Sequence, residues 1–155
     1  MENMDVQIVK LEPMRVAYAT GFGASPEMPA WEALRGWAQA RGLLAEGQKR
    51  RFFGFNNPDP TPGSPNYGYE AWMELPEEVA AEPPVQVKRV GGGLYAVTRV
   101  VGVDNIYGAW QKLVAGVETS PYTPVWNKQC LEEHILAFDV PPEELTLDLY
   151  MPVRE

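Results

Sequence analysis

The sequence contains a single cysteine, Cys130, and a single histidine, His134. One cysteine cannot form an intrachain disulfide, and this favours a reducing, cytoplasmic setting. One His and one Cys cannot supply a structural zinc set, and the acidic residues lack the spacing of a calcium-binding loop. No glycine-rich nucleotide-binding motif is present. We therefore expect no metal and no cofactor.

Basic charge and long apolar runs are also scarce. The chain has 13 Lys and Arg against 21 Asp and Glu, a net charge of −8. This balance argues against direct nucleic-acid binding, because such proteins present a basic face, and it favours cationic small molecules. The sequence has no run long enough to span a bilayer and no apolar secretory segment at its start. We therefore expect no association with membranes.

An internal repeat is the most informative feature that is present. Residues 6–23 match residues 85–102 without gaps, at an offset of 79 positions. A further match, at an offset of 78, places residues 69–73 over residues 147–151. Repeated units usually bury their apolar faces against each other. We therefore predict one domain over residues 1–155, with repeat 1 at about 5–76, a linker at about 77–84 and repeat 2 at about 85–153.

The two repeats predict the same series of elements. It is strand–strand–helix–strand–strand if the turn in the opening segment is counted as a break, and βαββ if the opening segment is counted as one strand. Capping signals at Ser25 and Asp104 predict the two helix starts. In the first repeat, the opening strands are followed by a predicted helix that ends at about Arg41 and by strands at 51–56 and 67–75. In the second repeat they are followed by a second predicted helix and by strands at 129–136 and 145–153. This order predicts an α+β fold of duplicated βαββ units with pseudo-twofold symmetry, an antiparallel sheet with helices on one side, and a ligand cleft between the halves.

Acidic residues alternate with aromatic ones on two of the predicted strands. Glu70 neighbours Trp72, and Asp148 neighbours Tyr150 at nearly equivalent repeat positions, on faces predicted to look away from the helices. A carboxylate among aromatic rings favours an organic cation. The alternative is the solvated outer face of an antiparallel sheet. Both interpretations remain open on the pattern alone.

A third acidic segment contains Glu132 and His134 on one predicted strand face. His134 could carry a proton beside Glu132, or it could be structural. Trp110, on the second predicted helix, is typical of a core residue but could also form the wall of a pocket. Cys130 has no nucleophile signature around it.

Five segments, in this order, resemble the GyrI-like small-molecule-binding domain, which is also the effector-binding domain of AraC- and MerR-type multidrug regulators. The segments are GFNNPDPTPGSPNYGYEAWMELP, VKRVGGGLYAVTRVVG, the Tyr107/Trp110 helix, CLEEHI and LTLDLYMPV. The resemblance implies a duplicated βαββ fold with a ligand cleft. Because no helix-turn-helix precedes residue 1, we expect a stand-alone form.

The resemblance also implies a role for one acid. In the family, a glutamate in a segment written roughly as Cys-Phe-Glu-Glu-Tyr receives the ligand, and the matching residue here is Glu132. This sequence differs from that pattern at Leu131 and His134. The candidate ligand-binding residues are Glu132, Trp72, Glu70, Tyr107, Trp110, Tyr150, Asp148, His134 and Trp126.

Three functions are consistent with the resemblance. The favoured one is a binder of amphipathic, aromatic, often cationic small molecules, for sequestration or effector sensing. The second is a hydrolase of cyclopropane-containing DNA-alkylating toxins, with Glu132 as the catalytic residue that activates water. The third is an interaction protein with gyrase or a regulator as its partner.

Overall fold

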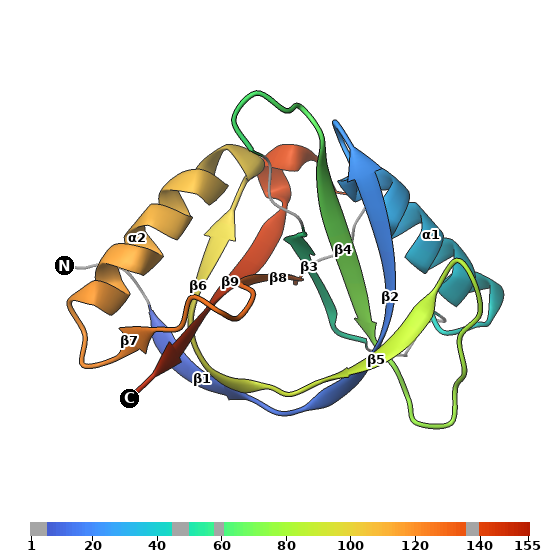
Figure 1. Cartoon of the computed structure of the whole chain (residues 1–155), viewed down its shortest axis with the longest axis horizontal. Coiled ribbons are helices and arrows are strands. Elements are labelled where there is room, and N and C mark those ends of the chain that lie inside the picture. The colour runs from blue at the N-terminus through green and yellow to red at the C-terminus, as the bar shows by residue number, and fades with distance from the viewer. Residues whose placement is uncertain (1–5, 45–49, 58–60, 136–139) are drawn as a thin grey trace. The chain divides into compact units, whose positions relative to one another are not determined.

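Two helices and nine strands form in residues 6–44, 50–57, 61–135 and 140–155, which the computed structural model describes (Figure 1). The first repeat contains β1 (Gln7–Leu11), β2 (Met14–Gly23), α1 (Glu27–Ala40), β3 (Phe52–Asn56) and β4 (Tyr67–Glu74). The second contains β5 (Gln86–Val90), β6 (Gly93–Val101), α2 (Ile106–Glu118), β7 (Thr123–Pro124), β8 (Leu131–His134) and β9 (Thr146–Arg154). The predicted α+β class and the duplicated βαββ order are confirmed, with the two-residue β7 as an addition. Residue 136, where the sequence placed the end of a strand, lies outside the described residues.

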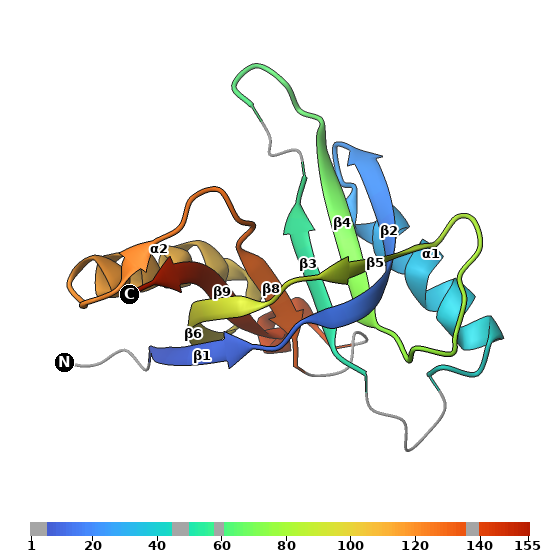
Figure 2. The same cartoon turned by 60° about the horizontal axis from the view of Figure 1, so that its bottom comes forward.

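The chain divides into two compact units that exchange their opening strands. Unit 1 comprises Met1–Glu12 and Gly92–Glu155, and unit 2 comprises Pro13–Gly91. Strand β1, from the first repeat, pairs antiparallel with β6 of the second (Figure 2). Strand β5, from the second repeat, pairs with β2 of the first. Each unit is therefore built mainly from one repeat and completed by a strand from the other.

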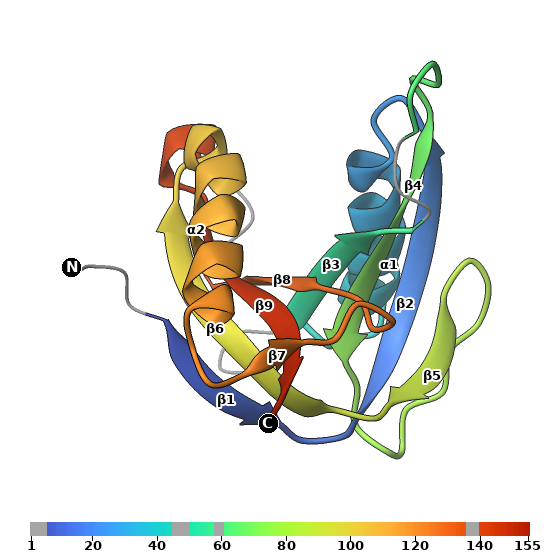
Figure 3. The same ribbon diagram turned by 60° about the vertical axis from the view of Figure 1, so that its left-hand side comes forward.

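Unit 2 is an antiparallel sheet in the order β3–β4–β2–β5, with α1 along β2 and β4 on one face (Figure 3). The Trp31 ring of α1 meets Tyr69 and Phe52, with ring centroids 6.2 Å apart in both pairs. Because side chains alternate along β4, Tyr69 faces the helix and its neighbours Glu70 and Trp72 face the other way. The predicted orientation of Glu70 and Trp72 is confirmed.

Unit 1 follows the same plan in the order β1–β6–β9–β8, and β7 pairs antiparallel with the end of β9, at Val153 and Arg154. One face of β9 packs on α2. The core of this unit consists of Ala96, Val100, Leu113, Val117, Leu147, Leu149, Met151 and Val153. Asp148 and Tyr150 alternate with Leu147 and Leu149, so they lie on the face away from α2, as predicted.

Both helix starts differ from the predicted ones. Asp104 lies within a short 3-10 turn, Val103–Asn105, and Asn105 precedes the first residue of α2. The Asn105 side chain donates instead to the Val101 carbonyl, at 2.8 Å. For α1 the preceding residue is Pro26, and neither helix has a side-chain cap. The predicted cap at Asp104 is wrong because Asp104 is part of the 3-10 turn, and Asn105 therefore occupies the N-cap position of α2.

Neither helix is long and apolar enough to cross a membrane, within the residues that the structure describes.

A tyrosine of β4 forms a hydrogen bond between the sheet of unit 2 and the first residue of α1. The Tyr67 hydroxyl donates to Glu27 Oε2 at 2.5 Å. This hydrogen bond, together with burial and the glutamate charge, raises the pKa of Tyr67 from 10.0 to about 12. A raised pKa in the folded state stabilises the protein below the unfolded value and loses that effect as pH rises through the folded value.

We expect a Tyr67→Phe variant to lose this pH dependence. The stabilisation by Tyr67 is fully present below pH 10 and disappears as the pH approaches about 12. The melting temperature of the wild type should fall more steeply than that of the variant across this interval. The wild-type-minus-variant phenolate absorbance should also show a titration centred near the raised pKa. Superimposable melting curves at every pH would contradict the assignment.

Candidate functional site

The pairing of β9 with β8 and with β6 brings an acid and two aromatic rings together in unit 1. Leu131 lies opposite Tyr150 and Glu133 lies opposite Asp148, so these four side chains share the face away from α2. The Tyr150 hydroxyl donates to Glu133 Oε1 at 2.5 Å. The Tyr95 and Tyr150 rings meet edge to face at 5.7 Å. Glu133 and Tyr150 are only 8% and 3% exposed, so this acid belongs to a largely desolvated aromatic cluster.

The same register places Glu132 and His134 on the other face of β8. Glu132 lies opposite Leu149, and His134 lies opposite Leu147, the leucines that pack against α2. Cys130 also packs against this core. The prediction that Glu132 and His134 share a strand face is confirmed, but that face is the helix side of the sheet. The acid that joins the aromatic cluster is Glu133, which the sequence reasoning did not select.

Asp148 is held in an ion pair on the same face as Glu133. Arg99 donates to both of its carboxylate oxygens, at 2.8 and 3.2 Å. The pKa of Arg99 is raised, chiefly by the hydrogen bond and charge of Asp148 and to a smaller extent by Glu133. Two carboxylates thus act on one guanidinium, and the Asp148 carboxylate is already matched to a cation of this chain.

Unit 2 contains a second acid–aromatic cluster, on the face away from α1. Glu70 is 5% exposed and Trp72 is 6% exposed. Trp72 Nε1 donates to Glu70 Oε2 at 2.5 Å, and the Lys88 ammonium forms an ion pair with the same oxygen. The Phe55 ring meets Trp72 edge to face at 5.1 Å. The carboxylate of Glu70 is therefore already matched to a cation of this chain.

Three of the predicted aromatic contacts lie elsewhere. The side chains of Tyr107 and Trp126 are 75% and 68% exposed. Trp110 is half-buried and packs against the core between α2 and its sheet. The structure does not bring these three residues into the Glu133 cluster. The predicted ligand cleft between the two halves stays a prediction.

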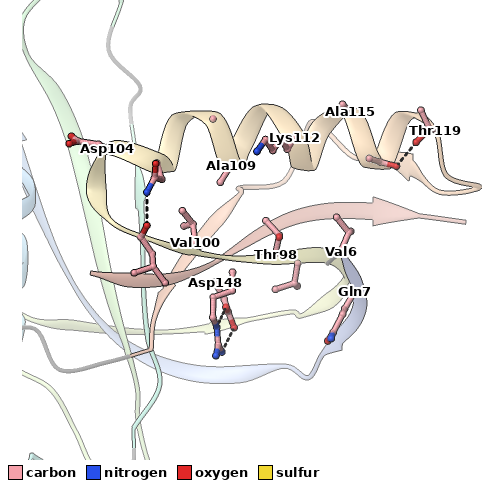
Figure 4. Close-up of a pocket in the computed structure, with 16 residues that line it drawn as sticks. Val6, Gln7, Thr98, Val100, Asp104, Ala109, Lys112, Ala115, Thr119 and Asp148 are labelled. Carbon is pink, nitrogen blue, oxygen red and sulfur yellow. Dashed lines mark hydrogen bonds and ion pairs between the residues drawn. The ribbon is translucent and has the colours of Figure 1, made fainter. Parts of the chain in front are cut away.

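A groove of about 1520 Å³ opens between α2 and β6 in unit 1 (Figure 4). Its helix side carries small residues, among them Gly108, Ala109 and Gly116, with Lys112 between them. Asp148 is the candidate residue that lines it, and that carboxylate is bound to Arg99. The groove has no aromatic lining residue, so it does not match the predicted aromatic cleft.

No group of three or more His, Cys, Asp or Glu side chains in the described ranges is arranged to hold a metal ion.

The duplicated βαββ order defines the chain as an α+β domain built from two similar units. The sequence matches the GyrI-like small molecule binding domain over residues 4–154, and the chain belongs to this family. The resemblance found in the sequence motifs is confirmed. No curated protein matches the sequence.

Several solved structures share the fold at low sequence identity. A hydrolase from Listeria innocua has a TM-score of 0.74 and 13% identity, over 99% of this chain and 94% of that one. The C-terminal domain of EcmrR has a TM-score of 0.73 and 14% identity, over 98% of each chain. SAV2435, solved bound to tetraphenylphosphonium, has a TM-score of 0.55 and 12% identity, over 97% of this chain and 94% of that one.

Proposed function

We propose that this protein binds aromatic, lipophilic cations, and that Glu133 with Tyr150 and Tyr95 forms the cation-recognising part of its site. The observation that carries the proposal is the buried Glu133 carboxylate, which accepts the Tyr150 hydrogen bond at 2.5 Å within an aromatic cluster. A carboxylate removed from water interacts more strongly with a cation, and the rings offer their negative faces to it.

Two further points support a cationic ligand. The net charge of −8 attracts cations over a distance. SAV2435, which shares the fold, binds tetraphenylphosphonium, a lipophilic cation. The acid proposed here is Glu133 in place of the sequence-based choice, Glu132, because Glu133 is the one that shares a face with Tyr150.

Titration with a matched pair of dyes tests the function. We expect rhodamine 6G, a planar cation, to show saturable binding by fluorescence anisotropy, and tetraphenylphosphonium to displace it. Fluorescein has the same ring core with negative charge and should bind at least about tenfold more weakly, a difference of about 1.4 kcal/mol. Equal affinity for the two dyes would contradict a cation site, and no saturable binding of either cation would contradict the proposed function.

A hydrolase is the second candidate, favoured by the match to the Listeria innocua hydrolase over nearly the whole chain. In this alternative Glu133 takes a proton from water while the water oxygen bonds to a carbon of the strained ring. One ring C–C bond breaks, and its electron pair takes up the proton from Glu133, so that the product is the substrate plus one water. Mass spectrometry of a cyclopropane-containing alkylator incubated with the protein distinguishes the two functions. Time-dependent formation of substrate plus one water, absent in Glu133→Gln, supports the hydrolase. Stoichiometric binding without turnover supports the binder.

A further inference from the structure

The Lys88 ammonium of β5 lies where an organic cation would be recognised. Its Nζ is 4.5 Å from the centroid of the Tyr18 ring and 5.1 Å from that of Trp72. It also forms an ion pair with the carboxylate of Glu70. Two aromatic faces and one carboxylate around an ammonium are the features by which proteins recognise amine ligands. We call Tyr18, Trp72 and Glu70 the unit 2 cage.

The strand register places these side chains on one face of the sheet of unit 2. Tyr18 of β2 lies opposite Trp72 of β4, and Lys88 of β5 lies opposite Val16, two residues before Tyr18. All of them therefore project from the face away from α1. Lys88 is diagonal to Tyr18 on the neighbouring strand, and a long side chain such as lysine can span that separation.

The walls of the cage are fixed by contacts that do not involve Lys88. Trp72 donates to Glu70 at 2.5 Å, and its ring meets Phe55 at 5.1 Å and Phe53 at 6.3 Å. The Tyr18 hydroxyl donates to Gln86 Oε1 at 2.8 Å. The rings and the acid are thus held in place by their neighbours, whereas the Lys88 side chain is 35% exposed. A preformed site needs little rearrangement when its cation is exchanged.

We propose that the unit 2 cage is an alkylammonium-binding site that the chain keeps filled with its own Lys88, and that accepts a primary ammonium group when Lys88 is withdrawn. Lys88 is then an internal competitor that keeps external cations out of this cluster. The inference goes beyond the function proposed for Glu133 and does not require it, because every residue of the cage lies in unit 2.

Chemical rescue of a Lys88→Ala variant tests the inference. The variant keeps the β-carbon and removes a fragment equivalent to n-propylammonium. It leaves the buried Glu70 carboxylate without its ammonium, which destabilises the fold. Added n-propylammonium should restore that contact and raise the melting temperature of Lys88→Ala by about 4 °C at tenfold excess over its dissociation constant. Sodium chloride at equal ionic strength should not raise the melting temperature of Lys88→Ala, and neither should 1-propanol.

Two matched variants identify the cage as the source of the effect. Lys112→Ala removes an exposed lysine in unit 1 and should show no rescue. Lys88→Ala combined with Glu70→Gln lacks the charge that attracts the ammonium and should also show none. A melting temperature that rises equally in Lys112→Ala, or in the double variant, would overturn the inference.

A measurement on the wild type covers the case in which Lys88→Ala does not fold. Reductive methylation with ¹³C-formaldehyde labels each lysine, and Lys88→Arg identifies the Lys88 resonance by its loss. Lys88 methyl groups between two ring faces should resonate upfield of those of Lys112, because ring currents shield them. A Lys88 resonance at the position of an exposed lysine would overturn the inference.

Discussion

Replacement of Glu133 by glutamine is expected to weaken rhodamine 6G binding about tenfold or more. Glutamine keeps the size of the side chain and an oxygen that accepts the Tyr150 hydrogen bond, so the cluster should remain folded. The substitution removes only the negative charge of Glu133, a residue that is 8% exposed. A contact between a buried charge and a ligand cation is typically larger than about 1.5 kcal/mol, which corresponds to at least tenfold in affinity.

The neighbouring residue provides the matched control. Glu132→Gln removes one negative charge from the same strand, so it changes the long-range field by the same amount. Its side chain shares a face with Leu149 and the core under α2, away from Tyr150. We expect its affinity for rhodamine 6G to stay within about twofold of the wild type, a change of less than about 0.5 kcal/mol. A large loss in Glu132→Gln with none in Glu133→Gln would return the ligand-binding role to Glu132.

Alanine at Gly21 is expected to destabilise the protein by about 3 kcal/mol and to lower its melting temperature by about 9 °C. A β-carbon at this position would lie 2.3 Å from the backbone oxygen of Pro26 and 3.4 Å from the Ala30 nitrogen. Those two atoms form the first hydrogen bond of α1, at 3.2 Å. Because the collision is with backbone, α1 must move away from β2 or lose its first turn.

Gly36 in the middle of α1 is the control for the Gly21 variant. Nothing lies within 4 Å of a β-carbon built there. Gly36→Ala should therefore stabilise the protein by about 0.8 kcal/mol, since alanine favours the helix. Thermal or urea unfolding measures both variants. Equal stability of Gly21→Ala and the wild type would contradict the close approach of α1 to β2.

The sequence was sufficient to predict the acid–aromatic faces. Alternation along a strand is a local property, so Glu70 with Trp72, and Asp148 with Tyr150, could be assigned to the faces away from the helices. Leu147 and Leu149, which alternate with Asp148 and Tyr150, identified the opposite face as core. Both assignments are confirmed by the core of unit 1 and by the contacts of α1.

The choice between two adjacent acids could not be made in the same way. Glu132 and Glu133 necessarily point to opposite faces of β8, and only the pairing with β9 decides which one meets Tyr150. A usable signal was the apolar Leu131, which shares its face with Glu133 and packs beside a tyrosine.

The role proposed for Lys88 depends on the pairing of β5 with β2, which the local sequence around Lys88 does not predict. The repeat aligns Lys88 with Val9, at the offset of 79 that relates the two opening strands. Those strands are exchanged, so Lys88 lies beside β2 of the other repeat and meets Tyr18, Trp72 and Glu70 there. Long-range strand pairing of this kind is set by the whole fold, and residue spacing does not reveal it.

A crystal structure of the protein with tetraphenylphosphonium would show whether Glu133 is the acid of the cation site in unit 1. We expect the cation to lie in contact with the Tyr150 and Tyr95 rings, with the Glu133 carboxylate as its nearest acid. A cation seated against Glu132 and the core under α2, or in the groove between α2 and β6, would contradict this expectation.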